Sequence, residues 1–162
     1  MAKLLIVFCV FCVLVLPPAS QAQVPVQASS NQEQLLASPD ARLAANKRLV
    51  YDFWREVLEG GHMEFADKYM AESYIQHNPN VPTGRTAFVT FFSKIAKPKT
   101  IEPTIKAPLV AIIAEGDLVV LGFVREEKDP KDAPKKYTTT WFDMFRIEHN
   151  KVAEHWDVST KE

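Results

Sequence analysis

The C-terminal end of the chain places the strongest constraint on the fold. Residues 137–147 and 151–158 are two apolar runs joined by His149-Asn150, which is typical of two strands and a tight turn. Both runs also carry acidic residues where a sheet normally buries its face. A buried carboxylate is costly unless it is hydrogen-bonded or kept to move a proton. This hairpin therefore predicts the wall of a pocket and not a plain structural edge.

The N-terminal residues predict an export signal. A short basic start precedes an apolar run over residues 4–16, which is shorter than the ~20 residues of a membrane-spanning helix. Pro17-Pro18 ends this run, and Ser20-Gln21-Ala22 offers small residues for cleavage before Gln23. We therefore expect residues 1–22 to be a signal peptide and the mature protein to be secreted, extracellularly or into the periplasm or secretory pathway. An uncleaved membrane anchor is the alternative.

Composition excludes several classes of function. Cys9 and Cys12 both lie inside the expected signal, so the mature chain would have no disulfide, no thiol nucleophile and no cysteine-bound metal. Loss of Lys3 changes the formal net charge from −1 to −2, and the remaining basic residues form only short loop groups, which argues against nucleic acid as a partner. Neither a phosphate-binding glycine loop nor a two-His-one-carboxylate spacing occurs, so we expect no cofactor and no metal.

The remaining patterns predict one α+β domain over residues 40–162. Residues 23–39 are rich in Gln, Ser, Ala, Val and Pro and are expected to form a disordered linker. Amphipathic helices are expected over 41–59, with Asp40 as N-cap, over 62–70, and from Gly84 to Pro98. Strands are expected over 72–78, 101–114, 118–126, 137–147 and 151–158. Helices followed by strands favour three helices packed on one face of a curved antiparallel sheet.

Two motifs carry a resemblance to a known family. The segment Tyr74-Ile-Gln-His77-Asn78-Pro79 and the ending Asp143-Met-Phe-Arg146-Ile…Lys151-Val-Ala-Glu154-His155-Trp156-Asp157 resemble SnoaL-like polyketide cyclases, of the nuclear transport factor 2-like superfamily. The resemblance covers about residues 41–158. It implies an α+β cone: a bent antiparallel sheet around three helices, a pocket at the wide end, and a homodimer formed through the outer sheet face.

The resemblance also implies roles for two acids. In the cyclases an aspartate near the end of the last strand is the general base, and Asp157 matches that position. A cyclase histidine on the preceding strand matches Asp143, so this chain departs from the pattern there. A base that takes a proton from a carbon next to a carbonyl needs a dry site, and burial beside Trp156 would provide one.

Strand alternation leaves open which acids face the pocket. In a regular hairpin with a two-residue turn, Ile147 pairs with Val152 and Asp143 pairs with Trp156, so Asp157 points away from Asp143. Both acids line one pocket only if a β-bulge lies between Val152 and Trp156. Without a bulge, Asp143 and Glu154 are the pocket acids.

Further residues complete the expected site. His77, at the end of the first strand, is a candidate proton partner or oxyanion donor, and His155 either orients the base or lies on the surface. The expected substrate-binding residues are aromatic and polar side chains of the same elements: Trp54, Tyr74, Asn78, Trp141, Glu154 and Trp156. The expected function is acid/base chemistry, either aldol-type cyclisation, isomerisation or dehydration, on a small hydrophobic carbonyl compound. A non-catalytic module that binds a small apolar ligand is the alternative.

Overall fold

The computed structural model describes residues 23–132 and 134–161. The expected signal peptide, with its cleavage site and both cysteines, lies outside the described residues. Within the described ranges, no helix has the length and apolar character needed to cross a membrane.

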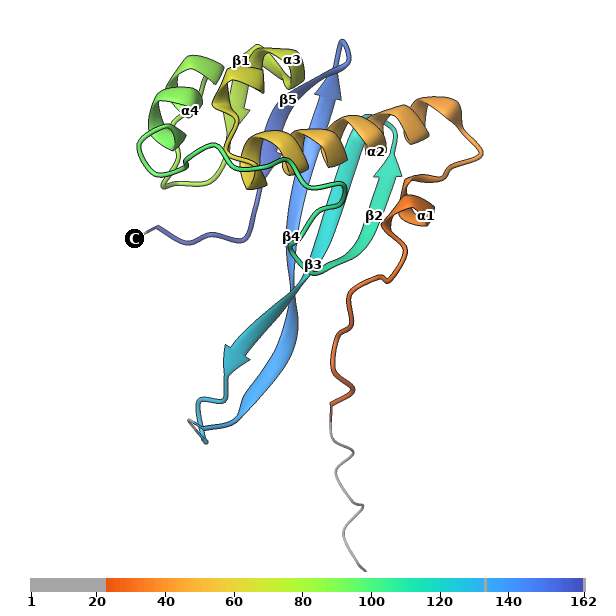
Figure 1. The fold of residues 1–162 in the computed structure, drawn as a ribbon, viewed down its shortest axis with the longest axis vertical. Coiled ribbons are helices and arrows are strands. Elements are labelled where there is room, and N and C mark those ends of the chain that lie inside the picture. Colours follow the sequence, from red (N-terminus) through yellow and green to blue (C-terminus); the bar gives the residue numbers. More distant parts are fainter. Residues whose placement is uncertain (1–22, 133, 162) are drawn as a thin grey trace, which may run out of the picture.

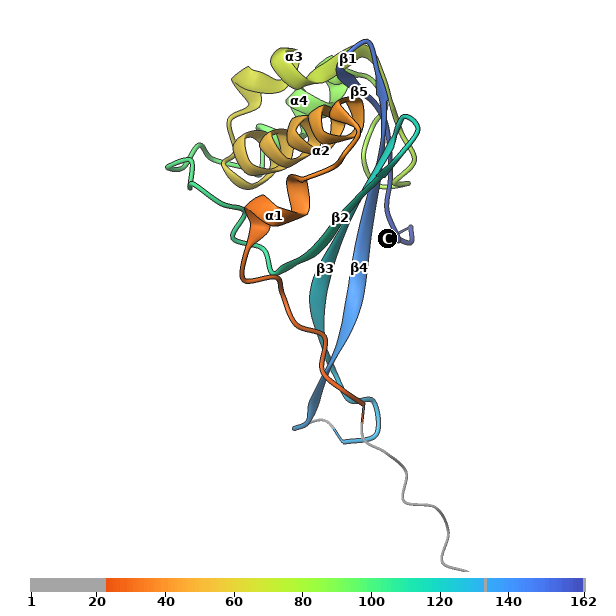
Figure 2. The ribbon, with the colours of Figure 1, turned by 90° about the vertical axis from the view of Figure 1, so that its right-hand side faces the viewer.

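The helices form one layer on one side of the sheet, as Figure 2 shows. The longest is α2 (Ala41–Phe53), which begins where the Asp40 carboxylate accepts hydrogen bonds from the backbone N–H groups of Arg42 and Leu43. It continues without a break into the π-helical segment η1 (Trp54–Glu59). The expected second helix is two short pieces, η2 (Met63–Phe65) and α3 (Ala66–Tyr69). The third, α4 (Arg85–Phe92), begins where it was predicted but ends before the expected Pro98.

The segment before α2 corrects the expectation of a disordered linker over residues 23–39. It contains a short helix, α1 (Gln32–Leu36), capped by the Asn31 side chain. Leu36 is buried in the core, and the Gln32 side-chain amide donates to the backbone oxygen of Ile105. The polar composition of the segment did not predict this structure, because a single buried leucine and a few hydrogen bonds are enough to hold a short segment in place.

Five strands form one sheet in the order β1-β5-β4-β3-β2. Their bounds are β1 (Met70–Gln76), β2 (Leu109–Glu115), β3 (Leu118–Lys128), β4 (Lys136–Glu148) and β5 (Lys151–Trp156). β1 pairs with β5 in parallel, so the sheet is mixed, which corrects the expected purely antiparallel arrangement. Residues 101–108, expected as strand, precede β2 as a loop.

The core lies between the helices and the inner face of the sheet. Phe53 at the end of α2 is fully buried, and its ring lies 6.1 Å from Tyr69, 6.3 Å from Phe88 and 6.0 Å from Phe145, centroid to centroid. The end of β3 and the start of β4 extend beyond the helices as a two-stranded arm, which Figure 1 shows below the helical layer. α2 crosses the sheet and contacts β2 and β3, whereas α3 and α4 lie against the β1 and β5 edge.

Candidate active site

A β-bulge in β5 determines which side chains enter the core. Ile147 pairs with Val152 but Arg146 pairs with Glu154, so Ala153 is the extra residue. The turn before it is formed by His149 and Asn150 with φ values of 49° and 56°. A bulge reverses the alternation of all later residues. His155 therefore lies opposite Phe145 on the inner face, and Asp157 joins Asp143 on the same cavity. Of the two alternatives that strand alternation left open, the structure has the one with a bulge between Val152 and Trp156.

These residues line a cavity of about 220 Å³ between the helices and the sheet. Part of the lining is apolar and largely aromatic, and the rest consists of hydrogen-bonding side chains of β1, β4, β5 and the residues that follow β1 and β5. The apolar lining consists of Phe53, Trp54, Leu58, Val81, Phe88, Phe92 and Phe145, and the polar lining of Tyr74, Gln76, Asn78, Asp143, His155 and Asp157. This division suits a ligand with an apolar body and one polar group.

Asp143 is almost completely buried, with 4% of its surface exposed, and all of its support comes from side chains. One carboxylate oxygen accepts a hydrogen bond from the indole N–H of Trp141 at 2.7 Å. The other lies 2.8 Å from Nε2 of His155. The opposite ring nitrogen of His155, Nδ1, lies 3.0 Å from the side-chain oxygen of Gln76. A chain of hydrogen bonds therefore links β4, β5 and β1 at the base of the cavity.

Asp157 sits at the end of β5 with a different set of partners. Its Oδ2 accepts a hydrogen bond of 2.7 Å from the side-chain amide of Asn78, and its Oδ1 accepts one of 2.8 Å from the backbone N–H of Ser159. These contacts fix the direction of the carboxylate. Each oxygen retains a further lone pair that could accept a proton from a ligand.

Tyr74 is a buried hydroxyl in the same lining. Burial, together with the nearby charges of Asp157 and Asp143, raises the pKa of this phenol, so the group stays protonated. Its oxygen accepts a hydrogen bond from Gln76 at 2.9 Å. Among the described residues its own proton has no protein acceptor, which makes it a candidate donor to a carbonyl oxygen.

Several residues expected at the site lie elsewhere. Because Ala153 reverses the alternation, Glu154 and Trp156 face the outer side of the sheet. Glu154 pairs there with His77 and with Arg146, and these hydrogen bonds lower the pKa of its carboxyl. The ring of His77 stacks on Trp156 at 4.7 Å. His77, Glu154 and Trp156 are therefore not cavity residues, which corrects the predicted roles of all three.

Of the other predicted site residues, all but Trp141 line the cavity. Trp54, Tyr74, Asn78, Asp143 and Asp157 all line the cavity. Trp141 lies behind Asp143 and reaches the cavity only through its hydrogen bond to that carboxylate.

Sequence reasoning missed Gln76 and left His155 undecided. The signal for Gln76 was present, because Tyr74, Gln76 and Asn78 alternate along β1 and its continuation and so share one face.

The cluster of Asp143, His155 and Asp157 also has to be considered as a metal site. One ligand atom from each of the three lies within 4.8 Å of the others. However, the Nε2 atom of His155 is already bonded to Asp143, and its Nδ1 faces Gln76. A metal ion would have to break the histidine–aspartate hydrogen bond, so this donor set fits a proton network better than a cation.

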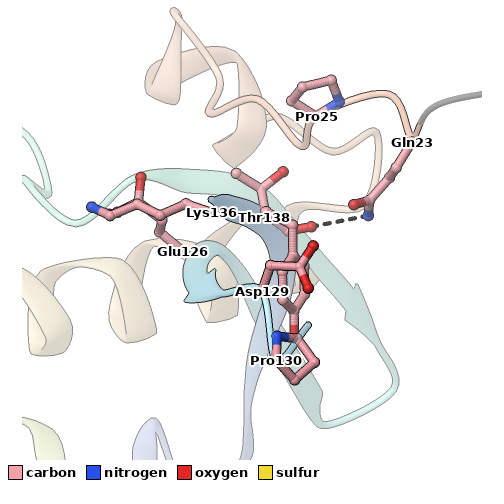
Figure 3. A pocket seen from close by; sticks show the side chains of 8 residues that line it. Gln23, Pro25, Glu126, Asp129, Pro130, Lys136 and Thr138 are labelled. Carbon is pink, nitrogen blue, oxygen red and sulfur yellow. Dashed lines mark hydrogen bonds and ion pairs between the residues drawn. The ribbon is translucent and has the colours of Figure 1, made fainter. Parts of the chain in front are cut away.

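A larger hollow of about 650 Å³ lies far from these groups, along the arm of β3 and β4. Figure 3 shows Gln23 and Pro25 of the N-terminal segment beside it, with the Gln23 side-chain amide bonded to the Thr138 carbonyl at 3.0 Å. Glu126 and Lys136 form an ion pair in its wall. The charges of Glu126 and Lys136 are thus paired with each other, and the smaller cavity, which holds the buried Asp143 and His155, is the better candidate.

Comparisons with known proteins agree with this architecture. The family model described as a SnoaL-like domain matches residues 50–155. A protein from Acidithiobacillus ferrooxidans described as a "putative polyketide cyclase" is 21% identical, with a TM-score of 0.52, over 75% of this chain and 90% of that chain. An epoxide hydrolase of the LEH-like type from M. tuberculosis is 12% identical, with a TM-score of 0.48, over 70% of this chain and 80% of that chain. Among curated proteins, none matches the sequence significantly. At these identities the structural likeness to the A. ferrooxidans protein shows the fold alone.

Proposed function

The chain belongs to the SnoaL-like domain family, and we propose that its cavity performs acid/base chemistry on a small, neutral, mostly apolar carbonyl compound. The observation that carries this proposal is the bulge at Ala153, which turns Asp157 into a cavity that already holds the protonated hydroxyl of Tyr74. A base and a hydrogen-bond donor on one cavity are the two groups that removal of a proton next to a carbonyl requires.

The proposed reaction begins at a carbon atom next to the carbonyl group. Asp157 accepts the proton from that carbon, and the electron pair moves into the carbonyl as an enolate. Tyr74 donates its hydrogen bond to the oxygen, where negative charge develops. Isomerisation, dehydration and aldol-type cyclisation share this first step and differ in how the enolate reacts afterwards. No cofactor is required for it.

The cavity also limits the substrate. Its volume of about 220 Å³ is below the roughly 300–1,000 Å³ of pockets that hold drug-sized ligands, which favours a compact ligand over a multi-ring one. Asp143 and Asp157 contribute negative charge, which His155 balances at most in part. An anionic ligand would therefore be repelled, and a neutral one fits the site better.

Non-catalytic binding is the second candidate. Both oxygens of Asp157 accept hydrogen bonds from the protein, and this arrangement also suits a carboxylate that only shapes the cavity. In that case the same ligands bind but are not converted.

A variant that fills the cavity tests the location of the site. Val81 is an apolar residue of the cavity lining, and Val81→Phe should remove binding of small cyclic and aryl ketones because it occupies their space. Ile95→Phe, at a position that is 68% exposed, is the matched control and should bind as the wild type does. Ligand-observed NMR with a ketone panel measures both, and equal binding by Val81→Phe would place the ligand elsewhere.

We also propose that the protein is a homodimer that pairs through the outer sheet face. Ile113, Val120, Met144 and Trp156 form one row across four strands of that face. Ile113 and Phe142 are 60% and 48% exposed. Light scattering should give twice the chain mass at micromolar concentration, and Ile113→Asp should give the mass of one chain. A wild-type protein that scatters as a monomer would contradict this.

Export remains a proposal as well. N-terminal sequencing of the mature protein should begin at or near Gln23, and the protein should be found outside the membrane fraction. A mature chain that still contains Cys9 and Cys12 would show that the signal is not removed.

A further inference from the structure

Gln76 joins three polar groups at the base of the cavity. Its side-chain nitrogen donates to the Tyr74 hydroxyl at 2.9 Å. Its side-chain oxygen accepts the backbone N–H of Asn78 at 3.0 Å and lies 3.0 Å from Nδ1 of His155. Gln76 and His155 are also register partners in the parallel pair of β1 and β5. One side chain therefore contacts the proposed oxyanion donor, the loop that holds Asp157, and the imidazole.

The orientation of this amide follows from its partners. A backbone N–H can only donate, so the Gln76 atom that faces Asn78 must be the oxygen. The same oxygen of Gln76 faces Nδ1 of His155, and an amide oxygen can only accept a hydrogen bond. Nδ1 of His155 must therefore carry a proton.

The other ring nitrogen of His155, Nε2, contacts the Asp143 carboxylate, which already accepts one hydrogen bond. Asp143 accepts the indole N–H of Trp141, and a hydrogen bond to the charged form of a carboxylate favours that form. The remaining proton between Asp143 and His155 then lies on the imidazole. The Asp157 carboxylate, with a ligand atom within 4.8 Å, favours the same cationic imidazole.

We propose that Gln76 is a positioning residue, which holds His155 as a doubly protonated imidazolium on the Asp143 carboxylate and leaves Asp157 as the group that exchanges a proton with the ligand. Both N–H groups of His155 point at protein acceptors, so His155 supplies charge and not a proton. Gln76 also occupies a lone pair of the Tyr74 oxygen, which directs the O–H of Tyr74 away from Gln76 toward the ligand.

Nitrogen-15 NMR of the imidazole rings tests the protonation state directly. His155→Gln identifies the His155 signals among the histidines of the chain. In the wild type, both ring nitrogens of His155 should appear protonated. Gln76→Glu keeps an acceptor for Nδ1 and should keep both protons. Gln76→Leu removes the acceptor, and His155 should become neutral with its single proton on Nε2.

Two results would overturn the inference. The first is an unprotonated ring nitrogen in the wild type, and this outcome decides the matter even if Gln76→Leu fails to fold. The second is a folded Gln76→Leu protein in which both nitrogens of His155 stay protonated.

The role of Gln76 in turnover rests on the proposed function and has its own readout. Gln76→Leu should lower kcat about 10²-fold with KM little changed, because a small misplacement of reacting groups costs that much. If Gln76→Leu gives the expected NMR result but an unchanged kcat, Gln76 does not position groups for catalysis, and the imidazolium state of His155 still stands. A wild type without any turnover, with the same NMR result, would reject the proposed function alone.

Discussion

Replacing Asp157 with asparagine should lower turnover about 10²–10⁴-fold, the contribution typical of a positioned general base. The asparagine side chain keeps the volume of aspartate, and its single oxygen can still accept one of the two hydrogen bonds, from Asn78 or from the backbone N–H of Ser159. It loses the ability to take up a proton from carbon, together with one hydrogen bond to the protein that does not involve the ligand. Ligand affinity should therefore change little, and steady-state kinetics together with NMR binding measure the two effects separately.

Two further variants make this result specific. Asp67→Asn removes one carboxylate at an exposed position of α3 and should leave turnover unchanged. Asp143→Asn should be milder than Asp157→Asn if Asp143 acts through His155, and comparable if the two acids titrate as one unit. A fall in turnover of less than about tenfold for Asp157→Asn would assign the base to another group.

The largest expected effect on stability comes from Phe53→Ala, which should lower the free energy of unfolding by about 3–5 kcal/mol. Phe53 has no exposed surface and lies at the point where α2, α3, α4 and β4 meet, as its contacts with Tyr69, Phe88 and Phe145 show. The change removes these contacts and leaves a void beside the ligand cavity. Urea unfolding followed by far-ultraviolet circular dichroism measures the difference.

The control for this experiment is Ile95→Ala. Ile95 is 68% exposed, so its truncation should change stability by no more than about 0.5 kcal/mol. A similar small effect for Phe53→Ala would mean that the helices do not pack on the sheet as described.

Local features of the sequence predicted much of the fold. Asp40 caps α2, as expected from its side chain. The turn at His149-Asn150 has the positive φ values that two-residue hairpins need. Both depend on neighbouring residues, so the sequence alone is sufficient to predict them. The five-strand sheet and its helical layer followed from the order of these elements.

Contacts between distant residues were harder to predict. The parallel pairing of β1 with β5 joins Gln76 to His155, and no local pattern specifies which strand lies beside β1. Leu36 is buried because it contacts a core that residues later in the chain form. In both cases the information lies in packing and not in the periodicity of one segment.

The bulge at Ala153 explains the mixed outcome at the site. Alternation alone could not place Asp157 and Asp143 on one cavity, and the shift that does so also moves Glu154 and Trp156 outward. It brings His155 to Asp143 and leaves His77 on the outer face with Glu154. The shift of one residue in the pairing of β4 with β5 therefore determines that His155, and not His77, belongs to the site.

Hydrogen exchange at the ligand tests the central claim most directly. A panel of compact, neutral ketones is incubated with the protein in D₂O, and NMR follows deuterium uptake at the carbon next to the carbonyl. The account predicts that the wild type accelerates uptake for at least one ketone over buffer and that Asp157→Asn does not. Equal acceleration by both proteins, or uptake at the buffer rate for every ketone that binds in the cavity, would contradict it.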